Sequence, residues 1–310
     1  MTLKLKILLV IAFFISAYFG RNYWLETHGY GSKQNTQNTD AKLQNLLAIG
    51  KKSETAHYAI SSTATPEQTT LVSDAVESLH AAYVEFFKDR IRNKKNPAKL
   101  KLMLYKDRKE FSVYNTSSSW AEAYYRKPVC YAYFSDEQPN PYHWMIHEAT
   151  HQLNNELAQL EIPKWVNEGL ATYFGTSKIE HGKLLPGNID KNTYPIWWLS
   201  GLDLSGDLES DIDTGKIIPL RAIISGKGGP DINKLVNLYY IEYWSFSHFL
   251  FHYKDGLYAD RYMQLITEGG SLENFERIVG PVDQIQAEWY GYLQQEIIEA
   301  ELDDSVEISL

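Results

Sequence analysis

The stretch HWMIHEATHQL, residues 143–153, places three histidines four residues apart and a glutamate directly after the middle one. Successive residues of an α-helix are about 100° apart, so His147 and His151 lie on one face, one turn from each other. Two imidazoles in this arrangement can bind the same metal ion. Glu148 falls beside that face, where a general base would stand. The stretch therefore predicts a helix with a metal-binding face.

We expect this helix to cover residues 142–157, with Asn140-Pro141 supplying the cap and the first turn. Apolar residues on the opposite side, such as Leu153, are predicted to pack into the core. His143 lies on the ligand side but one turn early, and we assign it a role beside the ligands or in solvent. H-E-x-x-H alone is only moderately specific, and an amphipathic helix with surface histidines is the alternative. A tetrahedral zinc site needs a third protein ligand. Whether the sequence offers one decides between a metal site and a helix with surface histidines.

The stretch IPKWVNEGLATYF, residues 162–174, supplies a candidate for that ligand. We expect a second helix here, with Pro163 in its first turn and Gly169 allowing it to approach the metal helix closely. Glu168 lies among apolar neighbours, and a buried carboxylate needs a charged partner. A zinc ion would be that partner, whereas a solvated Glu168 is the alternative.

HEATH followed by P-x-W-x-x-E-G-L-A-x-Y-F resembles the gluzincin zinc metallopeptidases, and is most similar to the bacterial peptidase-MA-like proteins of uncharacterised function. The resemblance implies one Zn²⁺ bound by His147, His151 and Glu168, with Glu148 as the general base. It spans roughly residues 54–299, with insertions. The sixteen residues between His151 and Glu168 are fewer than in the best-known gluzincins, which suits the smaller group.

The resemblance also implies a downstream tyrosine or histidine that stabilises the oxyanion. Tyr240 is the first candidate, ahead of Tyr243, Tyr239 and His248. The alternative for each is an aromatic helix face buried in the core.

Four further features of the sequence have both a functional and a simpler structural interpretation. His248 and His252 are four residues apart, but without an evident third ligand we expect core packing. The five carboxylates of residues 203–213 lack the pattern of an EF-hand loop, which favours an acidic surface insertion. Trp197-Trp198 could line a substrate cleft, although core burial is the default. Cys130 is the single cysteine and is expected to be a buried, small apolar residue.

Short strands are expected near residues 57–62, 99–104 and 129–134, and a short helix at residues 106–111. Thr65, Pro66 and Gln68 carry the pattern of a capping box that starts a long amphipathic helix. These elements alternate along the chain. The alternation predicts an α+β fold, and the resemblance implies that it is zincin-like, with a mixed sheet-and-helix lobe at residues 54–178 that carries the metal helix. A helical lobe at residues 179–300 and an acidic tail at residues 301–310 complete it.

The beginning of the chain has the pattern of an export signal. Two lysines precede the apolar run of residues 7–19, which is short for a membrane span. Residues 1–20 are predicted to be a signal peptide or an uncleaved N-terminal membrane anchor, followed by a flexible linker at residues 21–53. The expected location is extracytoplasmic: periplasmic or secreted, or tethered to the inner membrane through residues 7–19.

These expectations lead to a zinc-dependent peptidase that hydrolyses peptide bonds of a peptide or protein substrate. The alternative is an exported binding protein of the same fold that has no turnover. The formal net charge of −9 and the lack of a Lys/Arg stripe argue against nucleic acid as a partner.

Overall fold

The computed structural model describes residues 50–88, 98–115, 117 and 121–307, which lie in one compact unit. Its fold class is α+β, as predicted. The predicted signal peptide or anchor at residues 1–20 and most of the predicted linker lie outside the described residues. No helix in the described part of the chain is both long and apolar enough to cross a membrane.

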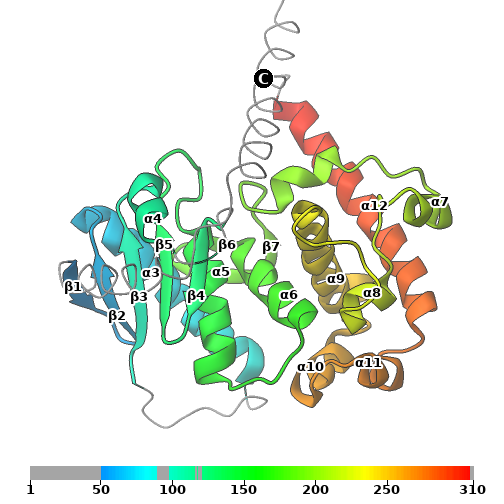
Figure 1. The fold of residues 1–310 in the computed structure, drawn as a ribbon, viewed down its shortest axis with the longest axis horizontal. Coiled ribbons are helices and arrows are strands. Elements are labelled where there is room, and N and C mark those ends of the chain that lie inside the picture. The colour runs from blue at the N-terminus through cyan, green and yellow to red at the C-terminus, as the bar shows by residue number, and fades with distance from the viewer. Residues whose placement is uncertain (1–49, 89–97, 116, 118–120, 308–310) are drawn as a thin grey trace, which may run out of the picture. The chain divides into compact units, whose positions relative to one another are not determined.

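A mixed five-stranded sheet forms one side of the unit (Figure 1). Its spatial order is β1-β2-β3-β5-β4, where the central pairs β2–β3 and β3–β5 are parallel and the outer pairs are antiparallel. The strands are β1 (Lys51–Glu54), β2 (Tyr58–Ser62), β3 (Leu100–Tyr105), β4 (Ala123–Arg126) and β5 (Val129–Tyr133).

Two strands of this sheet, β1 and β4, were not predicted from the sequence. β1 begins at Lys51, inside the predicted linker, so the sheet starts earlier than residue 54. All four of its side chains are exposed, and it is held by backbone pairing with β2 rather than by an apolar face. β4 forms the opposite edge of the sheet, where one backbone edge has no neighbouring strand among the described residues.

Helices cover the sheet and connect it to the rest of the unit. α3 (Pro66–Phe87) begins with the predicted capping box: the Gln68 amide donates to Thr65 Oγ1 at 3.2 Å, and the Thr65 amide donates to Gln68 Oε1 at 3.0 Å. α4 (Arg108–Tyr114) follows β3. α5 (His143–Gln152) carries the H-E-x-x-H motif and packs against β4, β5 and α3.

The metal helix differs from its prediction at both ends. Its N-cap is Tyr142, which makes no capping side-chain bond. Asn140 does not cap the helix: its carbonyl accepts a 2.8 Å bond from His143 Nδ1, and its side-chain amide binds Asp190. After Gln152 the α-helix changes into a π-helical turn, η2 (Leu153–Leu157), in which the Ala158 amide donates to the Leu153 carbonyl.

α6 (Lys164–Gly175) lies between α5 and the helices of the second half (Figure 1). Its N-cap is Pro163, one position before the predicted first turn. The second half is not purely helical, since β6 (Ser177–Glu180) and β7 (Lys183–Ile189) form a hairpin that packs against α3. A 3₁₀-helix and six α-helices follow among the described residues: η3 (Ile196–Gly201), α7 (Leu208–Asp213), α8 (Leu220–Ser225), α9 (Val236–Gly256), α10 (Ala259–Glu268), α11 (Leu272–Ile278) and α12 (Val282–Glu307). α12 thus continues past residue 300, where the acidic tail was expected to begin.

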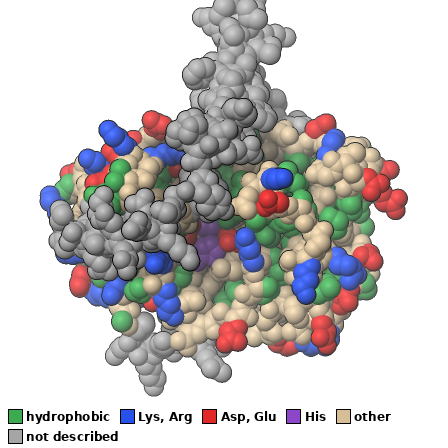
Figure 2. Space-filling model, in the orientation of Figure 1, with side chains coloured by type: hydrophobic (Ala, Val, Ile, Leu, Met, Phe, Trp, Pro, Cys, Tyr) green, Lys and Arg blue, Asp and Glu red, His purple; other side chains and the backbone are tan. Residues whose placement is uncertain are grey.

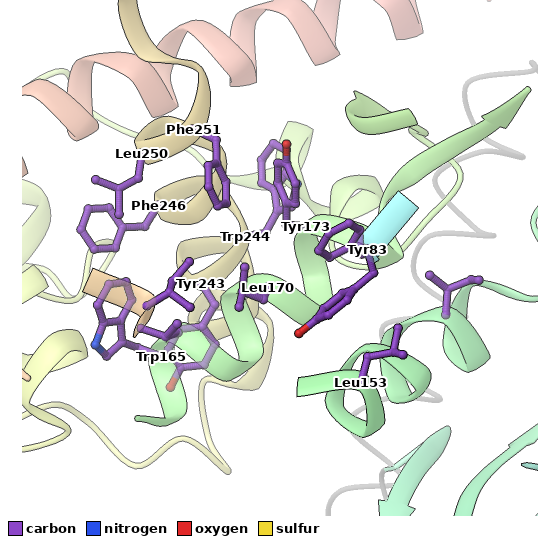
Figure 3. Close-up of a cluster of buried hydrophobic side chains, with 14 of the residues drawn as sticks. Tyr83, Leu153, Trp165, Leu170, Tyr173, Tyr243, Trp244, Phe246, Leu250 and Phe251 are labelled. Atoms are coloured by element: carbon purple, nitrogen blue, oxygen red, sulfur yellow. The ribbon is translucent and has the colours of Figure 1, made fainter. Parts of the chain in front are cut away.

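The core is aromatic where α6 meets α9 (Figure 3). Trp165 of α6 is buried against Phe246 of α9 and stacks on Tyr262, with ring centroids 5.9 Å apart. Burying side chains of this size contributes most of the favourable free energy of packing. This contact fixes the position of α9 relative to α6.

Candidate metal centre

Three donor atoms from α5 and α6 converge on one point. Nε2 of His147 and Nε2 of His151 are 3.2 Å apart, and each lies 3.5 Å from Oε2 of Glu168. In a tetrahedral zinc site with bonds of about 2.0–2.1 Å, neighbouring ligand atoms are separated by about 3.3–3.4 Å. The three atoms therefore have the spacing that a tetrahedral ion requires. Within the described residues they are the one His/Cys/Asp/Glu triad so arranged.

The burial of these atoms gives a second test of the fit. Their side chains are only 11–14% exposed. Glu168 Oε2 is buried and has no hydrogen-bond partner. Such an oxygen is unfavourable away from water, and a cation between it and the imidazoles would satisfy it. Two imidazoles and one carboxylate are also a donor set that zinc uses. The residues present fit a zinc ion.

Opposite charges couple the two helices even without an ion. Burial raises the pKa of Glu168, but the neighbouring His151 and His147 outweigh it and hold that pKa well below its usual range. Burial lowers the pKa of His151, whereas the charge of Glu168 outweighs it and raises the pKa to about 9. Without an ion the site therefore favours a carboxylate that faces a positively charged His151.

Glu148 lies beside this group, as the helical spacing predicted. Burial raises its pKa above the ordinary value, while the charges of His151 and His147 act in the opposite direction. The backbone amide of Tyr125, on the edge strand β4, lies close enough to Glu148 to lower its pKa as well. Glu148 is thus close both to the metal group and to the edge strand β4.

One polar residue of the metal helix, Gln152, holds the helix in place and was not among the predicted site residues. Gln152 is fully buried and donates through Nε2 to the carbonyls of Pro128, at 2.9 Å, and Lys101, at 3.2 Å. These bonds fix the end of α5 to the sheet. A glutamine on the buried face of an amphipathic helix was the available signal, since such a side chain needs partners.

A chain of hydrogen bonds between polar side chains continues behind His151. Tyr83 donates to Asn154 Oδ1 at 2.8 Å, and Asn154 Nδ2 donates to Asn167 Oδ1 at 2.9 Å. Asn167 is among the neighbours that raise the pKa of His151. α3, the π-helical turn and α6 are linked in this way next to one proposed ligand.

Two glycines of α6 set the distances between the helices. The prediction that Gly169 faces the metal helix is wrong: a Cβ there would lie 2.1 Å from Ser247 Oγ and 3.1 Å from the Tyr243 carbonyl, both on α9. Gly175 is the glycine near α5, with His147 Cβ 3.4 Å from its Cβ position. The sequence could not show this, because it does not specify which neighbour each face of α6 meets.

Tyr240 is the downstream tyrosine that reaches the metal group. Its ring centroid lies 6.0 Å from that of His147. Burial raises the pKa of the Tyr240 hydroxyl, and the charges of Glu168 and Glu148 raise it further. The hydroxyl therefore keeps its proton and can donate a hydrogen bond.

The other candidates for that role lie elsewhere or are engaged. Tyr239 donates to the Pro230 carbonyl at 2.7 Å. His248 lies between the Tyr292 hydroxyl, at 2.6 Å, and the Gly187 carbonyl, at 3.1 Å. Its ring lies 4.4 Å from that of His252, centroid to centroid. The expected core packing is confirmed for His248, which is buried, and is wrong for His252, which is exposed. Tyr243 lies next to Tyr240, with ring centroids 5.9 Å apart.

Histidine side chains reach the surface near the middle of the face shown in Figure 2. His143 is not one of the convergent ligands and does not face solvent: it is 2% exposed and packs on Trp144 and Trp197. The expected core burial of Trp197-Trp198 is wrong. They are 38% and 47% exposed because η3 packs through Ile196 and Leu199 instead.

Two remaining expectations are decided by burial. Cys130 is fully buried, as predicted, and its Sγ donates to the Glu148 carbonyl at 3.2 Å. The acidic stretch is not entirely on the surface, because Asp211 is fully buried. Its carboxylate accepts bonds from the Tyr290 hydroxyl, at 2.6 Å, and the Ser205 amide, at 2.9 Å.

No family model matches the chain, and no match is found among curated proteins.

Proposed function

We propose that the chain is a zinc-dependent peptidase with a zincin-like catalytic unit. The observation that carries the proposal is the convergence of His147, His151 and Glu168 at tetrahedral spacing. Glu148 lies next to this group and Tyr240 faces it. These are the parts that metal-assisted hydrolysis of an amide needs.

Each residue of the site has its own role in the proposed reaction. His147, His151 and Glu168 would hold a zinc ion, which would supply Lewis-acid activation of water and of a carbonyl group. Glu148 accepts the proton of the attacking water and passes it to the leaving amine. Its raised pKa brings it nearer to neutral pH, where proton transfer in both directions is most efficient. The Tyr240 hydroxyl donates a hydrogen bond to the developing oxyanion.

The sheet supports a peptide as the substrate. β4 is an edge strand, and the backbone of its Tyr125 lies beside Glu148. An extended peptide can add to such an edge through main-chain hydrogen bonds, which brings a peptide bond near the base. This arrangement favours a peptide over a compact small molecule.

The test compares two variants with the parent protein. Glu148→Gln keeps all three proposed ligands, so we expect unchanged zinc content and hydrolysis lowered by about 10²–10⁴-fold. Glu168→Ala leaves two imidazoles, so we expect zinc retention to fall sharply. Zinc is measured by atomic absorption, and hydrolysis by mass spectrometry of a proteome-derived peptide library.

Parental turnover in Glu148→Gln would refute the mechanism, and undiminished zinc affinity in Glu168→Ala would remove Glu168 from the site. A parent protein that binds zinc but cleaves no peptide in the library would support the binding-protein alternative.

A further inference from the structure

A row of aromatic side chains leads from the metal group to the surface. The ring of Tyr240, on α9, lies 6.0 Å from that of His147, and the ring of Tyr194 lies 5.4 Å from that of Tyr240, centroid to centroid. Trp197 of η3 follows at 6.1 Å from Tyr194. Trp144 of α5 lies 5.4 Å from Tyr194 and 6.2 Å from Trp197. We call Tyr240, Tyr194, Trp144 and Trp197 the aromatic wall, which is continuous from a proposed metal ligand to an exposed indole.

The aromatic wall is accessible and is already held in place by the protein. Its first three rings are half-buried, and Trp197 is 38% exposed. Tyr194 donates through its hydroxyl to Asn237 Oδ1 at 3.2 Å, and the ring of His143 packs edge-on against Trp197 at 5.4 Å. Because the rings are fixed before a ligand binds, little side-chain entropy is lost on binding.

A carboxylate lies beside the outer end of the aromatic wall. Asn140 joins Asp190 to this end: its side-chain amide donates to Asp190 Oδ2 at 3.0 Å, and its carbonyl accepts a bond from His143, whose ring packs on Trp197. The Asn192 amide donates to Asp190 Oδ1 at 2.9 Å. Both donors are neutral, and no Lys or Arg of the described residues forms an ion pair with Asp190. Its negative charge, which has the same sign as the net charge of −9, is therefore not neutralised.

We infer that the aromatic wall binds a positively charged side chain of the substrate, above all arginine, so that basic peptides are the preferred substrates; this rests on the proposed peptidase function. A guanidinium group stacks on the face of an indole or phenol ring, and the charge of Asp190 adds to the attraction. An extended peptide advances about 3.3–3.6 Å per residue, so the basic residue lies some residues away from the bond to be cleaved. An apolar side chain gains from the rings but not from Asp190, and is the alternative occupant.

The test measures binding rather than turnover. Acetylated and amidated octaglycine peptides carry one arginine, citrulline or phenylalanine at each position in turn, and are titrated calorimetrically into Glu148→Gln protein, with and without added zinc. Citrulline has nearly the shape of arginine but no charge. At the best position we expect the arginine peptide to bind about five- to thirtyfold more tightly than the citrulline peptide, as a cation–π contact provides. This advantage should shrink in about 1 M salt.

Two variants of the site, each with a matched control, are combined with Glu148→Gln. Trp197→Ala removes the exposed ring, and Asp190→Asn removes the charge and keeps an oxygen for hydrogen bonds. We expect each to lower the preference for arginine over citrulline several-fold. Trp198→Ala is the control for the ring, because Trp198 is 47% exposed in the same 3₁₀-helix and points away from Trp197 by about 120°. Asp213→Asn, at an exposed carboxylate of α7, is the control for the charge. Circular dichroism confirms that each variant is folded.

Four results would overturn the inference: equal affinity for the arginine and citrulline peptides, tightest binding of the phenylalanine peptide, no measurable binding of any peptide, or a preference that survives both Trp197→Ala and Asp190→Asn. An arginine preference that depends on the aromatic wall, in a parent protein that hydrolyses nothing, would refute the peptidase proposal and leave a binding site for basic peptides. Hydrolysis without preference for basic residues would do the reverse.

Discussion

Single side chains decide whether the metal group can perform chemistry. Tyr240 is the clearest case, because its hydroxyl keeps its proton while it faces the carboxylates of Glu168 and Glu148. It is the one proposed participant that comes from outside α5 and α6. Its contribution can be separated from metal binding, since it is not one of the three convergent donors.

Tyr240→Phe removes this hydroxyl and keeps the ring. We expect zinc content and thermal stability close to those of the parent, and hydrolysis lowered by about 10²–10³-fold, the usual effect of losing one oxyanion donor. Steady-state kinetics on a cleaved peptide provides the measurement. Tyr258→Phe is the control, because that hydroxyl binds Glu288 away from the metal group. Equal rates for both variants would exclude Tyr240 from the reaction.

Glu242 is a buried acid that the proposed reaction does not use. It is fully buried: Oε1 accepts a 2.7 Å bond from the Ile218 amide, whereas Oε2 has no partner. Burial raises its pKa well above 4.5. Below about pH 4.5 the acid is protonated in both the folded and the unfolded chain. As the pH rises further, the unfolded chain releases a proton that the folded chain retains, so stability falls.

Glu242→Gln keeps an acceptor for the Ile218 amide and removes the titration. We expect its free energy of unfolding, relative to the parent, to increase as the pH rises from 4.5 to 8. Urea unfolding at several pH values measures this difference. Glu276→Gln, at an exposed glutamate, is the control. A difference between Glu242→Gln and the parent that does not change with pH would contradict the assignment.

At the scale of elements, the contact between α6 and α9 positions Tyr240 relative to the proposed metal ligands. Gly169 permits this contact, since a Cβ there would overlap Ser247 Oγ. The residue next to it along α6 is Glu168. Any separation of the two helices therefore changes the distance between Glu168 and Tyr240.

Gly169→Ala should force α6 and α9 apart. We expect a loss of about 1–3 kcal/mol in the free energy of unfolding, as for other overpacked cores, together with slower hydrolysis and retained zinc. Adding Ser247→Ala removes the overlapping oxygen and should restore part of the lost stability and part of the lost hydrolysis rate. Gly291→Ala in α12 is the matched control, because nothing lies within 4 Å of its Cβ position. Chemical denaturation measures the stability, and peptide hydrolysis measures the activity. If Gly169→Ala changes neither, the interface between α6 and α9 adapts to the added methyl group and the prediction is wrong.

Periodic elements could be predicted from the sequence, whereas their partners could not. The capping box of α3, the alternation in β3 and the face of α5 that His147 and His151 share each follow from a local pattern. β1 has no apolar face, and the hairpin of β6 and β7 carries only weak alternation, so neither produced a signal. The orientation of Gly169 and the exposure of Trp197 depend on distant helices, and no local spacing encodes them.

At the scale of the whole molecule, the proposed metal would act as a cross-link between α5 and α6. A ligand that binds only the folded state stabilises it, by about 2.7 kcal/mol when its concentration is one hundred times its Kd. We expect a chelator to lower the melting temperature of the zinc-loaded parent and added zinc to restore it. Differential scanning calorimetry makes the measurement. The melting temperature of Glu168→Ala should change much less when chelator or zinc is added. An equal change in both proteins would place the stabilising ion elsewhere.

The proposed metal ligands lie close together in the sequence, between His147 and Glu168, whereas Tyr240 follows only after the hairpin and three further helical elements. Segments near each other along the chain meet with a smaller loss of chain entropy than distant ones. During synthesis or refolding, affinity for the ion should therefore arise before α9 docks. Stopped-flow refolding with a zinc indicator would show capture preceding the fluorescence change of the aromatic core, and simultaneous signals would exclude this order. The protein would then acquire its metal first and its capacity for reaction last.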